Sequence, residues 1–174
     1  FVRQWHVQRG VAADRLRVLP PGVDQPPADL RQDKRSQDKP LRFLYLGGIA
    51  RLKGIHILLT ALRQMQGTVE LWIAGDLTFD PAYSEQLRQL ATPQVTFLGR
   101  LERQAVWQTL TQVDAVLVPS LWPETYCFVA REAYAAGVPV IAARIGALSE
   151  LVRHEVDGLL VTPGDGQAWR SALQ

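Results

Sequence analysis

Short apolar stretches alternate with amphipathic ones from residue 41 to residue 161 of the 174-residue chain. The apolar stretches have the length of strands buried on both faces, and the amphipathic stretches between them have the length of helices. This alternation predicts an α/β fold with a doubly wound, Rossmann-like parallel sheet covered by helices on both faces. The expected strands are 41–46, 69–74, 95–98, 115–118, 138–142 and 158–161, and the expected helices are 54–65, 81–91, 103–111, 126–136 and 147–153.

The loop after the first expected strand, residues 47–54, is the first candidate for ligand binding. Ligands of doubly wound sheets lie beyond the carboxyl ends of the strands, near the point where the strand order reverses. The paired glycines at the start of the loop permit close approach of the backbone, and Arg51 and Lys53 could meet a diphosphate. The loop lacks the Gly-x-Gly-x-x-Gly spacing and the Walker Gly-Lys-Ser/Thr, so it predicts neither an NAD site nor an ATP phosphate loop.

Two carboxylates with seven residues between them mark the segment 119–133, which follows the strand 115–118. Pro123 and the possible N-cap Thr125 predict a helix that begins near Tyr126, so that Glu124 precedes the helix and Glu132 lies inside it. The unpaired N–H groups of a first helical turn attract anions. A phosphate is therefore expected between the two acids.

The surroundings of the two acids match a known pattern. Pro-Ser-x-x-x-Glu-Thr-Tyr, closed by Glu-Ala-x-Ala-x-Gly-Val-Pro-Val-Ile, resembles the signature of the retaining glycosyltransferases of group 1, which have the two-domain GT-B fold. A pair of solvated acids would explain the spacing alone but not the residues around it. The resemblance implies that Glu124 binds hydroxyls of the donor sugar, that Glu132 binds the ribose hydroxyls, and that the configuration of the sugar is retained.

The sequence departs from the family pattern at two positions. The family loop reads Gly-Arg-Leu/Ile-x-x-x-Lys-Gly, and here Lys53 matches while Gly48 stands at the position of the arginine. Arg51 is an alternative phosphate ligand or a solvent-facing loop residue. Cys127 stands where glycine is usual. A thiol nucleophile at a helix N-terminus is one reading of it, but no histidine base lies nearby in the sequence, so small-residue packing is preferred.

The resemblance covers nearly the whole chain and implies a complete donor site. The catalytic residues are expected to be Glu124 and Lys53. The loops after the second and third strands are expected to line the site as well, although a plain turn would also explain Gly75. The donor- and nucleotide-binding residues are expected to be Gly48, Arg51, Lys53, Gly75, Gly99, Arg100, Glu124, Thr125, Tyr126, Cys127, Phe128, Val129 and Glu132.

Three regions are expected along the chain. Residues 1–24, with a helix at 1–8 and a short strand at 17–19, are assigned to the end of an N-terminal domain and a hinge. Residues 25–40 are polar and contain proline, which is typical of a linker. Residues 41–174 form the donor-binding domain, which is expected to be truncated at its C-terminus. The chain is therefore interpreted as a fragment of a longer protein.

Composition excludes several functions. The net charge is +2 with dispersed lysine and arginine, which predicts no nucleic-acid partner. No apolar run reaches the length of a transmembrane segment, and the single cysteine fits a reducing cytosol. A cytoplasmic protein is expected, with any peripheral membrane attachment made by the missing N-terminal domain. Neither a metal site nor a cofactor is expected, because no acidic cluster is present and the nucleoside diphosphate sugar is a substrate.

These observations predict a glycosyltransferase of the hexosyltransferase type. The chain would bind a nucleotide sugar, and the missing N-terminal domain would hold most of a sugar or lipid-linked acceptor, so the fragment alone is expected to be inactive. Two alternatives stay open. One is another GT-B enzyme, such as a sugar-nucleotide epimerase or a phosphorylase. The other is a non-catalytic sugar-nucleotide-binding module, which Gly48 and Cys127 favour. The sequence does not indicate the base, the sugar, the acceptor or the linkage.

Overall fold

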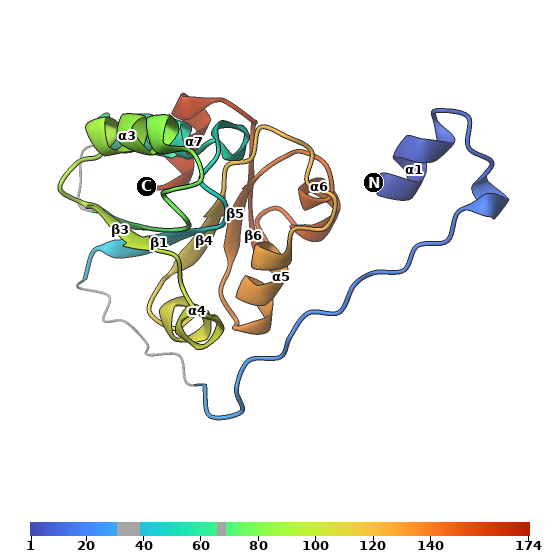
Figure 1. Cartoon of the computed structure of the whole chain (residues 1–174), viewed down its shortest axis with the longest axis horizontal. Helices are drawn as coiled ribbons and strands as arrows, with labels where there is room; N and C mark the ends of the chain where they lie inside the picture. The colour runs from blue at the N-terminus through green and yellow to red at the C-terminus, as the bar shows by residue number, and fades with distance from the viewer. Residues whose placement is uncertain (31–38, 66–68) are drawn as a thin grey trace.

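The computed structural model describes residues 1–30, 39–65 and 69–174 and contains one six-stranded sheet (Figure 1). All of its strand pairs are parallel, and β1 and β2 pair in register from Leu41 beside Val69 to Leu46 beside Ala74. The predicted fold class, a doubly wound Rossmann-like sheet, is confirmed. In the order β3-β2-β1-β4-β5-β6, the strands are β3 Val95–Gly99, β2 Val69–Ala74, β1 Leu41–Leu46, β4 Ala115–Val118, β5 Val140–Ala143 and β6 Gly158–Val161.

Helices cover both faces of the sheet, and each face has its own apolar core. Trp169 is fully buried in one core, and Trp107 is buried in the other. Figure 1 shows α3 and α7 on one side of the sheet and α4 and α5 on the opposite side. The first face carries α2 Ile55–Arg63, α3 Pro81–Leu90 and α7 Gly166–Ala172, and the second carries α4 Arg103–Leu110, α5 Phe128–Ala135 and α6 Leu148–Leu151.

The strand order fixes where a ligand can bind. The chain adds β2 and β3 on one side of β1 and then returns to place β4 on the other side. The loops that follow β1 and β4 therefore diverge to opposite faces and leave a crevice at the carboxyl ends of these two strands. Both candidate motifs of the sequence, the glycine loop and the paired acids, follow these two strands.

Two local predictions are wrong. Thr125 does not cap the signature helix, because α5 begins at Phe128 and its N-cap is Cys127, which has a φ of 58° and makes no side-chain capping bond. A left-handed residue cannot continue a helix, so the start moves two residues along the chain. The strand expected at 17–19 is absent.

The N-terminal region contains little regular structure. It has the helix α1 Val2–Val7 and the single 3-10 turn η1 Ala13–Arg15, and then runs without helix or strand to residue 30. Half of the predicted linker, residues 31–38, lies outside the described residues. Among the residues described, no helix is both long enough and apolar enough to cross a membrane.

Candidate functional site

A cleft of about 430 Å³ lies at the carboxyl ends of β1 and β4, at the point where the strand order reverses. The end of β1 forms one wall, and the other walls are the loop after β4 and the first turns of α5. Both loops bring charged groups into an otherwise apolar space. The lining residues are Tyr45, Leu46, Gly47, Lys53, Val106, Leu117, Val118, Ser120, Glu124, Thr125, Tyr126, Cys127, Phe128, Val129 and Glu132.

Lys53 and Glu124 meet in this cleft although 71 positions separate them in the sequence. Lys53 Nζ lies 2.7 Å from Glu124 Oε1, and Ser120 Oγ donates a hydrogen bond of 2.6 Å to the same oxygen. The Glu124 side chain is 15% exposed and that of Lys53 is 39% exposed. The carboxylate is thus held in place by two donors, while the ammonium remains accessible to a ligand that enters the cleft.

Two glycines allow close packing against the loop that carries Glu124. Gly54 has a φ of 72°, and a Cβ at this position would lie 2.1 Å from the carbonyl oxygen of Pro119 in the loop after β4. Gly146 has a φ of 58°, and a Cβ there would lie 2.6 Å from the carbonyl oxygen of Glu124. Only glycine combines this backbone conformation with such close approach. The Gly54 contact brings the loop of Lys53 close to the loop of Glu124, and the Gly146 contact packs the loop after β5 against the backbone of Glu124.

Glu132 faces the cleft from the second turn of α5 and has a different partner. Arg103 Nη1, at the first residue of α4, lies 2.6 Å from Glu132 Oε1, and Arg103 Nη2 lies 2.8 Å from Asp24 Oδ2. The hydrogen bond to Glu132 raises the pKa of the Arg103 guanidinium above its ordinary value. The two acids of the signature are therefore paired with different cations, one on each side of the cleft.

The start of α5 lies between the two acids. Phe128 and Val129 line the cleft, and the N–H groups of this first turn have no acceptor within the helix, which makes it suited to an anion. Burial raises the pKa of the Cys127 thiol to about 11, so the thiolate fraction at neutral pH is very small. This agrees with packing rather than a nucleophilic role. Within the described residues, no group of His, Cys, Asp and Glu side chains could hold a metal ion.

The structure brings together most of the predicted site residues but not all of them. Gly48 lies outside the cleft lining, and its carbonyl oxygen accepts a hydrogen bond of 2.6 Å from the Tyr45 hydroxyl. Arg51 is turned towards α3, where it donates a hydrogen bond of 2.6 Å to Gln86 Oε1. Also outside the lining are Gly75, Gly99 and Arg100.

Three polar residues in or beside the cleft, Tyr45, Ser120 and Arg103, were not among the predicted site residues. Tyr45 is the last but one residue of β1, and Ser120 lies two residues beyond the end of β4. Ser120 belongs to the Pro-Ser part of the signature, so the signature could have indicated its role. Arg103 gives no such signal, because it is one of many dispersed arginines and its contact with Glu132 depends on how α4 packs beside α5.

Comparison with known proteins agrees with this arrangement. The family model for glycosyl transferases group 1 matches residues 40–174. A D-inositol 3-phosphate glycosyltransferase of Xylanimonas cellulosilytica is 34% identical over 182 residues, a match that covers 94% of this chain and 43% of that protein. A glycogen synthase of Mycobacterium tuberculosis is 32% identical over 145 residues, covering 81% of this chain and 35% of the relative. The chain belongs to the group 1 glycosyl transferases and spans less than half the length of these relatives.

Solved structures with this fold include nucleotide-bound proteins. HepE of Anabaena, in complex with UDP and glucose, superposes with a TM-score of 0.83 at 30% identity; the match covers 98% of this chain and 50% of that one. Sucrose-phosphate synthase from Thermosynechococcus elongatus gives a TM-score of 0.80 at 31% identity, covering 98% and 46% of the two chains. The fold of this chain thus occurs in a protein that has been crystallised with a nucleotide and a sugar.

Proposed function

We propose that residues 41–174 are the donor-binding domain of a retaining glycosyltransferase that uses a nucleoside diphosphate sugar. The observation that carries this proposal is the meeting of Lys53 and Glu124 beyond the carboxyl ends of β1 and β4, at 2.7 Å, with Glu132 on the other side of the α5 N-terminus. A cation, an anion-binding helix end and two carboxylates in one cleft match the chemistry of a diphosphate that carries a sugar at each end.

Each group then has one part of the donor to bind. The diphosphate would lie against Lys53 and the first N–H groups of α5, where a negative charge is favoured. Glu132 would accept hydrogen bonds from the ribose hydroxyls. Glu124, which Ser120 and Lys53 already orient, would accept hydrogen bonds from the hydroxyls of the transferred sugar.

Transfer would depend mainly on positioning and on stabilising the diphosphate as it leaves. Lys53 and the α5 amides would take up the charge that develops on the leaving group, and the proposed mechanism requires no metal ion or cofactor. Retention of configuration and a hexosyl donor are proposed from the family signature. The acceptor would be held mainly by an N-terminal domain, so this domain alone would bind the donor and transfer no sugar.

We propose UDP as the nucleotide of the donor. The support is the complex of HepE with UDP and glucose, in which half of the HepE chain is 30% identical to this chain. UDP and UDP-glucose are therefore the first ligands to test by calorimetry.

The division of labour between the two acids tests the proposal. Glu132→Ala should weaken UDP and UDP-glucose alike, by about 1.5–3 kcal/mol, because it removes charge-assisted hydrogen bonds to the ribose. Glu124→Ala should leave the affinity for UDP nearly unchanged and weaken UDP-glucose, because its partner is present only with the sugar. Calorimetric titration of both variants with both ligands decides the matter. Equal losses of UDP affinity would leave only a generic acidic pocket.

A further inference from the structure

Arg103 occupies a position that is unfavourable for a cation. It is the first residue of α4, where the positive end of the helix dipole and the unpaired N–H groups favour an anion. Two carboxylates offset this cost, since the guanidinium binds Glu132 at 2.6 Å and Asp24 at 2.8 Å. The guanidinium also lies 4.8 Å from the centre of the Trp107 ring. These contacts fix the side chain in one orientation.

Glu132 depends on this arginine for its own orientation. Its side chain is 13% exposed and faces the cleft, and among the described residues Arg103 makes the one recorded hydrogen bond to its carboxylate. Glu124, by contrast, has two donors. A glutamate has three rotatable side-chain bonds, so a nearly buried carboxylate without this partner would lose a defined direction.

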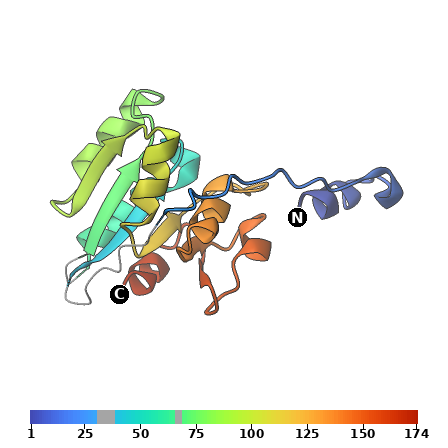
Figure 2. The same ribbon diagram turned by 90° about the horizontal axis from the view of Figure 1, so that it is seen from below.

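The third member of this group belongs to the N-terminal segment. Residues 21–24 are attached to the cleft wall twice, because the Tyr126 hydroxyl donates a hydrogen bond to the carbonyl oxygen of Pro21 and Arg103 binds Asp24. Figure 2 shows this segment passing across the side of the domain that carries α4 and α5. Asp24 thus holds Arg103 from outside while Glu132 holds it from inside the cleft.

We propose that Arg103 is a positioning residue that aims the Glu132 carboxylate at the ribose of the donor, and that Asp24 fixes Arg103 for this task. The proposal rests on the proposed function. A carboxylate offers about four lone-pair sites, so Glu132 can accept from Arg103 and from ribose hydroxyls at the same time. Donor affinity would then depend on a residue that never touches the donor, and through it on the segment 21–24.

The test compares UDP with 2′,3′-dideoxyuridine diphosphate, which lacks both ribose hydroxyls. Arg103→Ala should weaken UDP by about three- to tenfold, the size expected for one charge-assisted bond at a half-exposed site. The dideoxy nucleotide, which Glu132 cannot bind through hydroxyls, should bind the variant and the unchanged chain equally. Asp24→Asn should weaken UDP in the same direction by less. Isothermal calorimetry gives all of these dissociation constants.

Two controls separate positioning from general damage. Arg88→Ala removes an arginine of similar exposure that pairs with Glu85 on α3, and it should not change the affinity for either nucleotide. When Arg103→Ala is added to the Glu132→Ala variant, the affinity for UDP should not fall further, because the carboxylate that Arg103 positions is already absent. Equal weakening of both nucleotides by Arg103→Ala, or no weakening of UDP, would overturn the inference. If UDP fails to bind the unchanged chain, the proposed function itself is wrong.

Discussion

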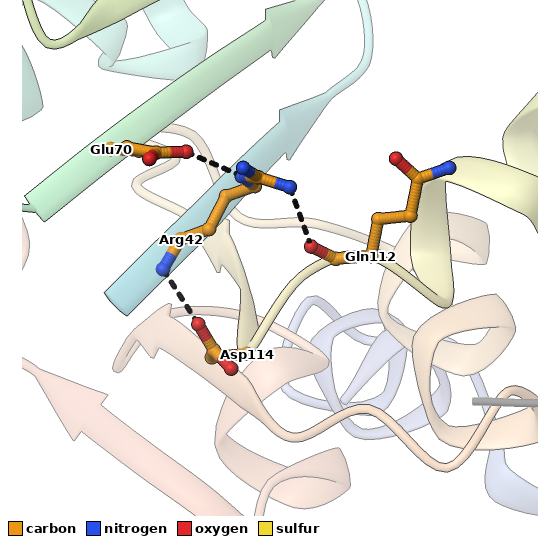
Figure 3. A network of polar contacts seen from close by, with 4 residues as sticks. All are labelled: Arg42, Glu70, Gln112 and Asp114. Carbon is orange, nitrogen blue, oxygen red and sulfur yellow. Dashed lines mark hydrogen bonds and ion pairs between the residues drawn. The ribbon is translucent and has the colours of Figure 1, made fainter. Parts of the chain in front are cut away.

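Each end of the sheet carries a pair of a basic side chain and a glutamate, but the two pairs serve different purposes. At the amino ends of the strands, Arg42 Nε lies 2.5 Å from Glu70 Oε2, its Nη1 donates to the carbonyl oxygen of Gln112, and its backbone N–H donates to Asp114 Oδ2 (Figure 3). At the carboxyl ends, Lys53 and Glu124 form one pair beside a cleft. The first arrangement ties β1 to β2 and to the segment that leads into β4, whereas the second leaves a cation accessible.

The difference lies in what surrounds each cation. The Arg42 guanidinium lies 4.1 Å from the centre of the Trp72 ring and uses its donors on groups of the protein itself. The Lys53 ammonium has three donors and, in the part of the chain that is described, one recorded partner. An ion pair whose cation binds several groups of the protein contributes to the fold, and one whose cation has a single partner can exchange that partner for a ligand.

The largest effect expected from this comparison is on stability. Arg42→Ala should lower the free energy of unfolding by about 3 kcal/mol, because it leaves the partly buried Glu70 carboxylate and the Gln112 carbonyl without their donor. UDP affinity should not change. Urea denaturation measures the free energy of unfolding, and calorimetry measures the affinity for UDP. Arg88→Ala is the control, because Arg88 belongs to an exposed ion pair, and it should change the free energy of unfolding by no more than about 0.5 kcal/mol. A loss of UDP affinity in a folded Arg42→Ala variant would break the separation between the two ends.

A substitution at the cleft end of the sheet should have a smaller effect, and this effect should be on binding. Lys53→Ala should weaken UDP by about 2 kcal/mol, the range for a hydrogen bond to a charged group, with little effect on the melting temperature. Uridine, which has no phosphate, should bind as before. Arg51→Ala is the matched control, because the structure turns Arg51 towards Gln86, and it should weaken UDP much less. If uridine loses as much affinity as UDP, the loop binds something other than phosphate.

The sequence predicts the fold well because strand burial is a local signal. The apolar runs identified every strand of the sheet, and both motifs were found in loops that follow strands, where ligands of such sheets lie. The partners of the acids were not predictable in the same way. The pairing of Arg103 with Glu132 and Asp24 joins three distant segments, and it depends on helix packing that no periodicity describes.

The helix start was missed for a related reason. Thr125 has the usual chemistry of an N-cap, and nothing in the local pattern opposes it. The structure instead places Cys127 in the left-handed region, with a φ of 58° and a ψ of 77°, against the wall of the cleft. Tertiary packing around the cleft therefore overrides the local preference, and it holds a residue with a Cβ in a conformation that suits glycine.

This strain gives the smallest and most local prediction. At an ordinary position alanine is at least as stable as glycine, but at position 127 the left-handed backbone penalises any Cβ by about 1 kcal/mol. Cys127→Gly and Cys127→Ala lose the same buried sulfur and differ in the Cβ, so the order of their stabilities shows whether the backbone strain of a Cβ at this position outweighs the packing that the Cβ provides. We expect the glycine variant to be more stable than the alanine variant by about 1 kcal/mol in urea denaturation. Ala61, which is buried in the last turn of α2, provides the control, because Ala61→Gly should be less stable than the unchanged chain. An alanine variant as stable as the glycine variant would mean that the left-handed backbone at position 127 penalises a Cβ by less than the packing of that Cβ contributes.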